Sequence, residues 1–167
     1  MAGHMDKIQV VKLKAEDLSV FKAIRLESLR MDPSAFANTL ADWSCLSDKE
    51  WLDRMNIPVF AALKGDEPVG VMGLMPQRGE KRSHRATIIM VYLRESERGS
   101  GLADQLLETL MHFARNDGRR QLELNVNHTN ARAIRFYQRH GFKTVGKIPA
   151  ALIDGGREID ELIMVCQ

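Results

Sequence analysis

Apolar and polar residues alternate or cluster along this chain in a way that predicts seven strands. Residues 7–13 alternate with the period of two that is typical of a strand with one buried face. The apolar run of residues 86–93 is rich in β-branched side chains, which indicates a central strand. The other strands are expected at residues 58–63, 69–75, 122–126, 142–148 and 158–165, with hairpin turns at residues 64–67 and 154–156.

A spacing of three to four residues between apolar positions predicts helices between these strands. Leu102, Leu106 and Leu110 form one apolar stripe, and Ser47 with Glu50 forms a capping box that opens a short helix. Helices are therefore predicted at residues 16–30, 47–55, 102–116 and 130–140. The resulting order, β-α-α-β-β-β-α-β-α-β-β, predicts a single-domain α/β (α+β) fold with a mixed central sheet and helices on its faces.

The length and charge of the chain restrict the classes of function. A chain of 167 residues forms one domain with a core of ordinary size. The formal net charge is +2, which is too small to predict a nucleic acid or an anionic membrane as partner. The five histidines show neither HxH nor HExxH spacing, so no metal site is expected.

The chain shows no signal for export or for a membrane span. Its longest apolar run, residues 88–93, is far shorter than the ~20 residues that cross a bilayer, and its first residues are polar and charged. Cys45 and Cys166 form no CxxC pair, and two thiols in a chain of this size suggest a reducing compartment, so the cytoplasm is the expected location. Residues 1–4 look like a remnant of cloning, which leaves residues 5–167 as the domain.

The most informative segment is a glycine-rich turn between the central strand and the helix at residues 102–116. It reads Arg98-Gly99-Ser100-Gly101-Leu102-Ala103. Its glycines allow a tight turn and the close approach of a ligand, and the free N–H groups of the next helix favour an anion such as a pyrophosphate. The turn is neither a P-loop nor a GxGxxG motif, so by itself it also fits a simple helix start.

A second informative segment opens the helix at residues 130–140. Asn130 and Tyr137 are seven residues apart, which is about two helical turns, so their side chains share a face. Taken singly, Asn130 fits a helix cap and Tyr137 fits a core aromatic residue.

Together, the two segments resemble the GNAT superfamily of N-acetyltransferases. The family motif R/Q-x-x-G-x-G/A, between its fourth strand and third helix, is matched by Arg98, Gly101 and Ala103. The family's Asn, followed by A-I-x-x-Y and then G-F, is matched within residues 130–142. The element order also agrees, so the resemblance covers roughly residues 7–166. Each motif is weak alone, but both in the right order make a specific match.

The resemblance implies acetyl-coenzyme A as the co-substrate. Main-chain N–H groups of the glycine-rich turn would bind the pyrophosphate, and the end of the central strand would pair with the pantetheine arm and polarise the thioester carbonyl. Asn130 would hydrogen-bond the pantetheine, and Tyr137 would protonate the departing thiolate. The coenzyme-binding residues implied in this way are Val91, Tyr92, Leu93, Arg98, Gly99, Ser100, Gly101, Leu102, Ala103, Asp104, Asn130 and Tyr137.

The role implied for Tyr137 agrees with solution chemistry. A thiol has a pKa of ~8.5 and a phenol one of ~10, so the phenol keeps its proton at neutral pH until a thiolate needs it. No nucleophile is paired with a base, so we expect the acyl group to pass directly to an amine.

The acceptor side is less well defined. Many relatives carry a glutamate five residues before the motif asparagine, but this chain has Asn125 there, which cannot accept a proton. Glu123 lies on the same strand face and could act through water, and the loop residue His128 has a suitable pKa, but neither is assigned as the base. The resemblance places the region around Trp43 and the last hairpin loop, residues 149–157, at the acceptor pocket. Trp43, Glu123 and Asn125 are therefore the candidates for contact with the acceptor.

Three other functions stay open at this point. A catalytically silent acyl-coenzyme A-binding module would bind the coenzyme but release no thiol. Another phosphate-binding enzyme, such as a nucleotide kinase, is disfavoured because GK[ST] and a carboxylate set for Mg²⁺ are lacking. An interaction domain could use the basic loop at residues 78–85, which could alternatively reach a coenzyme phosphate. The acceptor could be a small amine, a lysine or a protein N-terminus, and a homodimer stays open because family members often dimerise.

Overall fold

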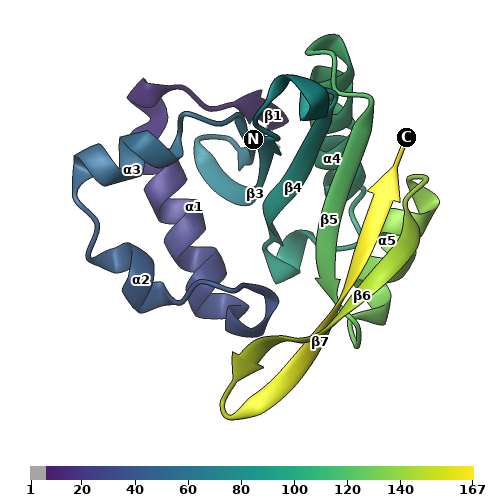
Figure 1. The fold of residues 1–167 in the computed structure, drawn as a ribbon. Helices are drawn as coiled ribbons and strands as arrows, with labels where there is room; N and C mark the ends of the chain where they lie inside the picture. The colour runs from purple at the N-terminus through teal and green to yellow at the C-terminus, as the bar shows by residue number, and fades with distance from the viewer. Residues whose placement is uncertain (1–6) are drawn as a thin grey trace.

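The computed structural model describes residues 7–167, which form a seven-stranded sheet with helices on both faces (Figure 1). The strands are β1 (Ile8–Lys12), β2 (Val59–Lys64), β3 (Glu67–Pro76), β4 (Arg85–Leu93), β5 (Gln121–Asn127), β6 (Lys143–Asp154) and β7 (Arg157–Cys166). Their order across the sheet is β1-β2-β3-β4-β5-β7-β6, and only the β4–β5 pair is parallel. The expected cloning remnant, residues 1–4, lies outside the described residues, so the domain boundary at residue 5 stays a prediction.

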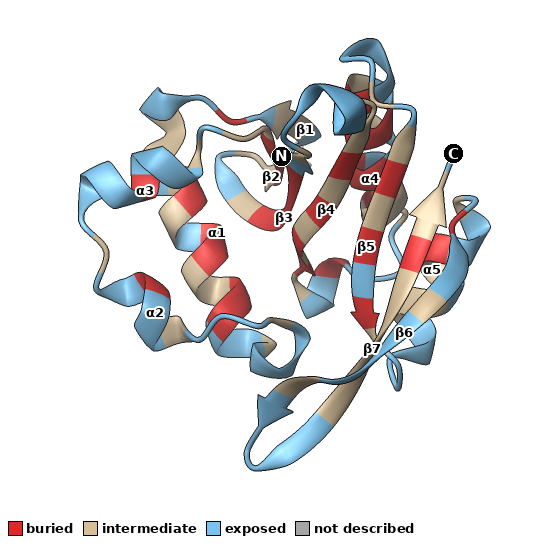
Figure 2. Ribbon diagram, viewed as in Figure 1, coloured by how far each residue is buried: buried red, intermediate tan, exposed pale blue. Residues whose placement is uncertain are grey.

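Two apolar cores lie on opposite faces of the sheet. The helices are α1 (Leu18–Met31), α2 (Leu40–Ser44), α3 (Asp48–Arg54), α4 (Leu102–Asn116) and α5 (Ala131–Arg139). Helices α1 to α3 cover one face, and α4 and α5 cover the other (Figure 1). Strand β2 contributes side chains to both cores. Val59 and Ala61 pack toward α1, whereas Phe60 and Ala62 pack toward α4. Figure 2 shows the matching buried stripe along α1.

The predicted mixed α/β fold is confirmed, and every predicted strand and helix is present. The structure adds one α-helix, α2, that the apolar spacing did not indicate. Five residues are too few to show a period, but Thr39 and Asp42 form a capping box in which Thr39 Oγ1 accepts from Asp42 N at 3.2 Å and Asp42 Oδ2 accepts from Thr39 N at 2.7 Å. Trp43, which is buried, anchors this short helix to α1.

The last hairpin is longer than expected. Strand β6 continues through residues 149–154, which the sequence placed in a loop, as far as the two-glycine turn at Gly155 and Gly156. Both glycines have positive φ, as a tight two-residue hairpin requires. Pro149 is tolerated because β6 is the edge of the sheet, and the pairing is irregular around Ala150, whose φ is 48°.

Strand β4 carries a β-bulge that the apolar run did not indicate. Against β3, Tyr92 pairs with Val71 and Ile89 pairs with Gly73, so β4 has one extra residue in this interval. Met90 within it has a φ of 57°, which is rare for a bulky side chain and stores strain. Because of the bulge, Ile89 and Met90 pack toward the same core although they are consecutive.

Candidate active site

Strands β4 and β5 separate soon after they begin, and this separation forms the site. They pair only between residues 85–87 of β4 and residues 121–123 of β5. Beyond Thr87, the edge of β4 that faces β5 therefore has no strand partner among residues 7–167. Free N–H and C=O groups on such an edge can bind an extended ligand as if it were another strand.

A cleft of about 460 Å³ opens along this edge, and we call it the α4–α5 cleft. Every residue expected to contact the coenzyme lines it, except Ser100 and Leu102. These two residues support the turn instead. Ser100 Oγ donates to the carbonyl oxygen of Glu97 at 2.6 Å and accepts from Leu102 N at 3.3 Å, and the Leu102 side chain is buried in the core.

The glycines of the turn give the cleft a main-chain wall. Gly99 and Gly101 have φ values of 81° and 86°, which side-chain-bearing residues rarely adopt. Apart from the glycine itself and its neighbours in the chain, no atom lies within 4 Å of the position where a Cβ would stand at either glycine, so both positions are open. Gly101 is also the N-cap of α4, and the first N–H groups of that helix lack helical partners. The turn and the helix start therefore form a site that suits a phosphate anion.

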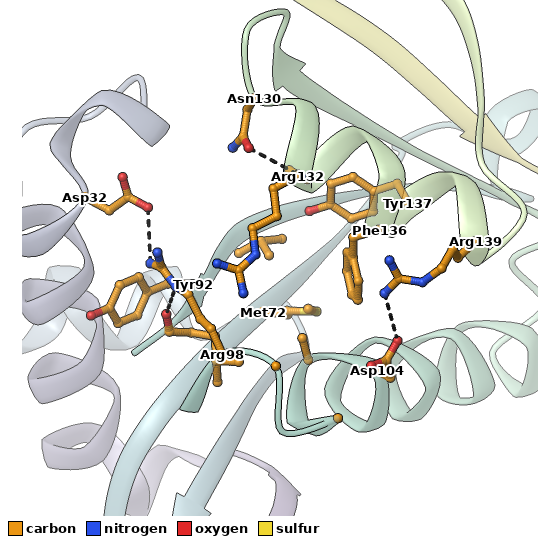
Figure 3. A pocket seen from close by; sticks show the side chains of 16 residues that line it. Asp32, Met72, Tyr92, Arg98, Asp104, Asn130, Arg132, Phe136, Tyr137 and Arg139 are labelled. Atoms are coloured by element: carbon orange, nitrogen blue, oxygen red, sulfur yellow. Dashed lines mark hydrogen bonds and ion pairs between the residues drawn. The ribbon is translucent and has the colours of Figure 1, made fainter. Parts of the chain in front are cut away.

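Basic side chains surround the α4–α5 cleft (Figure 3). Arg98 contributes its guanidinium, whose Nε donates to the Leu93 carbonyl oxygen at 3.0 Å. Arg132 and Arg139 project from α5, and Arg139 lies 3.6 Å from Asp104, a carboxylate that also contacts His140 at 2.8 Å. Sequence reasoning missed both α5 arginines, although their seven-residue spacing matches that of Asn130 and Tyr137.

Tyr137 and Asn130 both line this cleft from α5 (Figure 3). Tyr137 is 5% exposed and packs edge-on against Phe136 and Phe142. Burial raises the pKa of its phenol, so the hydroxyl keeps its proton well above neutral pH. Asn130 caps α5, since its Oδ1 accepts from Ala133 N at 3.1 Å, and it faces the cleft as well.

Tyr92, the other tyrosine of the chain, points toward α1 (Figure 3). Its hydroxyl donates to Glu27 at 3.1 Å, and Glu27 also accepts from Arg94 at 2.9 and 2.7 Å. Burial, followed by the bond to Glu27, raises the pKa of Tyr92 to about 12. The Tyr92 hydroxyl thus joins β4 to α1 through its hydrogen bond to Glu27, whereas Tyr137 lines the α4–α5 cleft.

A second cleft, of about 470 Å³, opens on the helical face that carries α1, and we call it the α1–α3 cleft. Arg25, Phe36 and Trp43 line its helical side. Asn125 of β5 and Glu161 of β7 line its strand side, where Asn125 Nδ2 donates to Glu161 Oε2 at 3.3 Å. Two of the three residues expected at the acceptor, Trp43 and Asn125, therefore share one cleft.

Glu123 lies outside both clefts. Its carboxylate accepts from the Arg85 guanidinium at 2.7 and 3.1 Å, from Gln77 at 3.1 Å and from Thr87 at 3.3 Å. These contacts occupy the oxygens that a water relay would need. His128 is also absent from both clefts, and its Nδ1 lies 3.2 Å from the carbonyl oxygen of Asp160.

The two clefts open onto adjacent residues of β4. Ile89 and Met90 line the α1–α3 cleft, and Val91, Tyr92 and Leu93 line the α4–α5 cleft. The bulge thus lies between the β4 residues that line the two clefts.

The residues around the α4–α5 cleft fit acyl-coenzyme A. The unpaired β4 edge suits the amides of a pantetheine arm, and the open glycine turn with Arg98 nearby suits a pyrophosphate. Within residues 7–167, no cluster of His, Cys, Asp and Glu could hold a metal ion. No helix in the same part of the chain is long and apolar enough to cross a membrane.

Comparison with known proteins identifies the family of this chain. Residues 24–142 match the model of the acetyltransferase (GNAT) family. The L-methionine sulfoximine/L-methionine sulfone acetyltransferase of Pseudomonas aeruginosa is 30% identical over 142 residues, which are 78% of this chain and 81% of that protein. The L-amino acid N-acetyltransferase of Escherichia coli is 30% identical over 151 residues, which are 86% of this chain and 90% of that protein.

A solved structure shows the same fold. The putative acetyltransferase of Salmonella typhimurium, determined with its cofactor acetyl-CoA, aligns with a TM-score of 0.82 and 20% identity over 96% of this chain and 94% of that chain. The chain therefore belongs to the acetyltransferase (GNAT) family, and it is an acetyl-coenzyme A-dependent N-acetyltransferase.

Proposed function

We propose that this enzyme moves an acetyl group from acetyl-coenzyme A directly to the primary amine of a small, amino-acid-like acceptor. The observation that carries the proposal is the pair of clefts that open onto adjacent residues of β4. Acetyl-coenzyme A in the α4–α5 cleft supplies an activated acyl thioester. The amine enters from the α1–α3 cleft and reaches the thioester at the bulge.

The α4–α5 cleft holds the coenzyme largely through main-chain groups. Arg98 N already donates to the Glu95 carbonyl oxygen and Leu102 N to Ser100 Oγ, so these two groups are not free. The pyrophosphate is bound by the N–H groups of the cleft-lining residues Gly99, Gly101, Ala103 and Asp104, and the Arg132 guanidinium adds positive charge over the cleft. The β4 edge from Val91 to Leu93 pairs with the pantetheine arm, and one of its N–H groups polarises the thioester carbonyl. Asn130 donates from its amide nitrogen to the same arm, because its oxygen is used in capping α5.

Tyr137 acts as the general acid. When the amine nitrogen bonds to the acetyl carbon and the carbon–sulfur bond breaks, Tyr137 donates its phenolic proton to the sulfur, which leaves as a thiol. The raised pKa of Tyr137 keeps this proton in place before the transfer. Solvent then returns a proton to the phenolate.

Glu161 receives the proton that the amine must lose. It is a carboxylate on the wall of the α1–α3 cleft, and Asn125 holds one of its oxygens at 3.3 Å. Glu123 is bound to Arg85 and lies outside the cleft. Glu161 thus takes, from a neighbouring strand, the task that Asn125 cannot perform.

The names of the relatives support an amino-acid-like acceptor. Two proteins of similar length that share 30% identity with this chain are an L-methionine sulfoximine/L-methionine sulfone acetyltransferase and an L-amino acid N-acetyltransferase. A cleft of about 470 Å³ is of the size that encloses a small molecule.

A thiol-release assay tests the proposal. Acetyl-coenzyme A is incubated with L-amino acids, methionine sulfone, polyamines and a lysine peptide, and the products are identified by mass spectrometry. We expect free thiol and an N-acetylated amino acid in equal amounts. Coenzyme binding without thiol release for every amine would instead identify a catalytically silent acyl-coenzyme A-binding module.

A further inference from the structure

Arg25 occupies a core position in α1, where a charged residue is unusual. The residue is 2% exposed, and it lines the α1–α3 cleft. Its guanidinium carbon lies 4.8 Å from the centre of the Phe36 ring and 4.5 Å from that of the Trp43 ring. The two aromatic faces hold the guanidinium in a fixed place and offset part of its lost hydration.

The Arg25 guanidinium lacks a counter-ion within residues 7–167. Its Nε is buried without a hydrogen-bond partner, and its one side-chain partner there is Ser28, whose Oγ accepts from Nη1 at a long 3.4 Å. No carboxylate of that part of the chain lies within 4.0 Å of it. Burial lowers the pKa of Arg25 to about 10, so the group still carries its charge at neutral pH.

The guanidinium of Arg94, unlike that of Arg25, is paired with carboxylates. It is bonded to Glu27 and to Glu67, both at 2.7 Å, although the Arg94 side chain is 29% exposed. The more deeply buried Arg25 has no such partner, which is costly for a charge out of water. A binding site whose ligand supplies the anion explains this difference.

The other charged residues of the α1–α3 cleft are arranged to suit such a ligand. Arg54 stacks on the Trp43 ring at 5.2 Å and adds a second positive charge on the helical side. Glu161 lies on the strand side, and Asp53, which is exposed, is the remaining carboxylate of the lining. An acceptor that carries an acid group at one end and an amine at the other matches this distribution.

We propose that Arg25 binds the acid group of the acceptor and thereby selects amines that also carry a carboxylate or a similar anion. The proposal rests on the proposed function, because the amine of the same molecule must reach the thioester at the β4 bulge. Arg25 is then a specificity-determining residue. It excludes polyamines and amino-acid amides, which would leave its charge buried and unpaired.

The test compares two substrates that differ only in this group. We would measure kcat/KM for the L-amino acid that gives the fastest thiol release and for its primary amide, with wild type, Arg25→Met, Arg25→Lys and Arg30→Met. Methionine keeps most of the apolar stem of arginine and removes the charge. We expect wild type to prefer the acid about a hundredfold, Arg25→Met to lose this preference through a raised KM for the acid alone, and Arg25→Lys to restore part of it.

Arg30→Met is the matched control, because Arg30 is an exposed arginine of the same helix, α1, and lines neither cleft. We expect it to retain most of the preference for the acid. An equal loss on acid and amide in a folded Arg25→Met protein would show a structural role and overturn the proposal. Thiol release that is equally fast with amines lacking an acid group in wild type would also overturn it.

A measurement on wild type alone covers the case in which Arg25→Met does not fold. The carboxylic acid that lacks the amino group should compete with the amino acid, and its carboxamide should compete at least tenfold less well, about 1.4 kcal/mol. Equal competition by both would overturn the proposal. Failure of the proposed function is a different result, since no amine of any kind would then release thiol.

Discussion

The two clefts on either side of the β4 bulge are built in different ways. The α4–α5 cleft is lined mainly by three contiguous segments, which are the end of β4, the glycine turn with the start of α4, and α5, and the first two of these offer main-chain groups. The α1–α3 cleft is assembled from side chains of α1, α3, β4, β5 and β7, together with the segment around α2. A ligand shared by a whole family can be bound by backbone geometry, whereas a particular acceptor requires side chains gathered from many elements.

The difference extends to charge. In the α4–α5 cleft, Arg98 and Arg132 stand near open main-chain N–H groups, as suits a polyanion. In the α1–α3 cleft, Arg25 and Glu161 bring opposite charges to opposite walls, as suits a small zwitterion. Variants that act on one cleft should therefore spare the other, and the predictions below use this separation.

The largest expected effect is on turnover and comes from Tyr137→Phe. Loss of the general acid should lower kcat by ~10²–10⁴-fold, because the thiolate must then leave without a proton. The coenzyme Kd, measured by calorimetry, should change little, since the ring and its contacts with Phe136 and Phe142 are kept. A kcat equal to that of wild type would remove Tyr137 from the mechanism.

Glu161→Gln should lower kcat/KM for the acceptor by ~10²-fold near neutral pH, the lower end of the range for losing a general base. The loss should shrink as pH rises, because above its own pKa the amine needs no base. The control is Glu123→Gln, which removes the charge of the ion pair with Arg85 outside the clefts and should change stability more than rate. A pH-independent loss, or an equal loss in the control, would contradict this role.

Gly101→Asp should weaken coenzyme binding about tenfold or more and leave the acceptor preference unchanged. The new side chain would project into the open face of the turn and repel the pyrophosphate. Gly118→Asp provides a matched control at the other end of α4, because Gly118 also has a positive φ and open space around it. Calorimetry should show an unchanged coenzyme Kd for the control. An equal change of Kd in both variants would contradict the placement of the pyrophosphate at Gly101.

The smallest expected effect is on stability and comes from Glu27→Gln. The hydrogen bond from Arg94 holds the pKa of Glu27 below its ordinary value, so the ionised carboxylate stabilises the fold. This stabilisation is fully present above about pH 5 and is lost as the pH falls through the lowered folded-state pKa. Urea titrations should show that Glu27→Gln is about 1 kcal/mol less stable than wild type at pH 7 and that the gap closes in acid. A pH-independent gap would show that the contact is not electrostatic.

How far the sequence predicts this molecule depends on how local each feature is. The glycine turn and the pair Asn130 and Tyr137 are short motifs with regular spacing, so they carried the family resemblance that implies the coenzyme side, and both line the α4–α5 cleft. The bulge at Met90 could not be predicted, because a methionine with positive φ is held there by the surrounding sheet.

The acceptor side required the folded structure. Glu161 comes to Asn125 only through the pairing of β5 with β7, which spans 36 residues of sequence. The resemblance predicted both Trp43 and Glu123 at the acceptor. Only the folded structure shows that Glu123 is instead bound to Arg85. The helical spacing could have identified Arg25 as a buried charge. It follows Phe21 and Ile24 and precedes Ser28 and Leu29 on the buried face of α1.

The most direct test is a crystal structure with a conjugate that joins the coenzyme A sulfur, through a thioacetyl link, to the amino nitrogen of the best amino-acid acceptor. We predict the pyrophosphate at Gly99 and Gly101, the sulfur beside Tyr137, and the carboxylate at Arg25, with the link passing β4 at Met90 and Val91. A conjugate that leaves the α1–α3 cleft empty, or that approaches β4 from one side only, would contradict a transfer between two clefts.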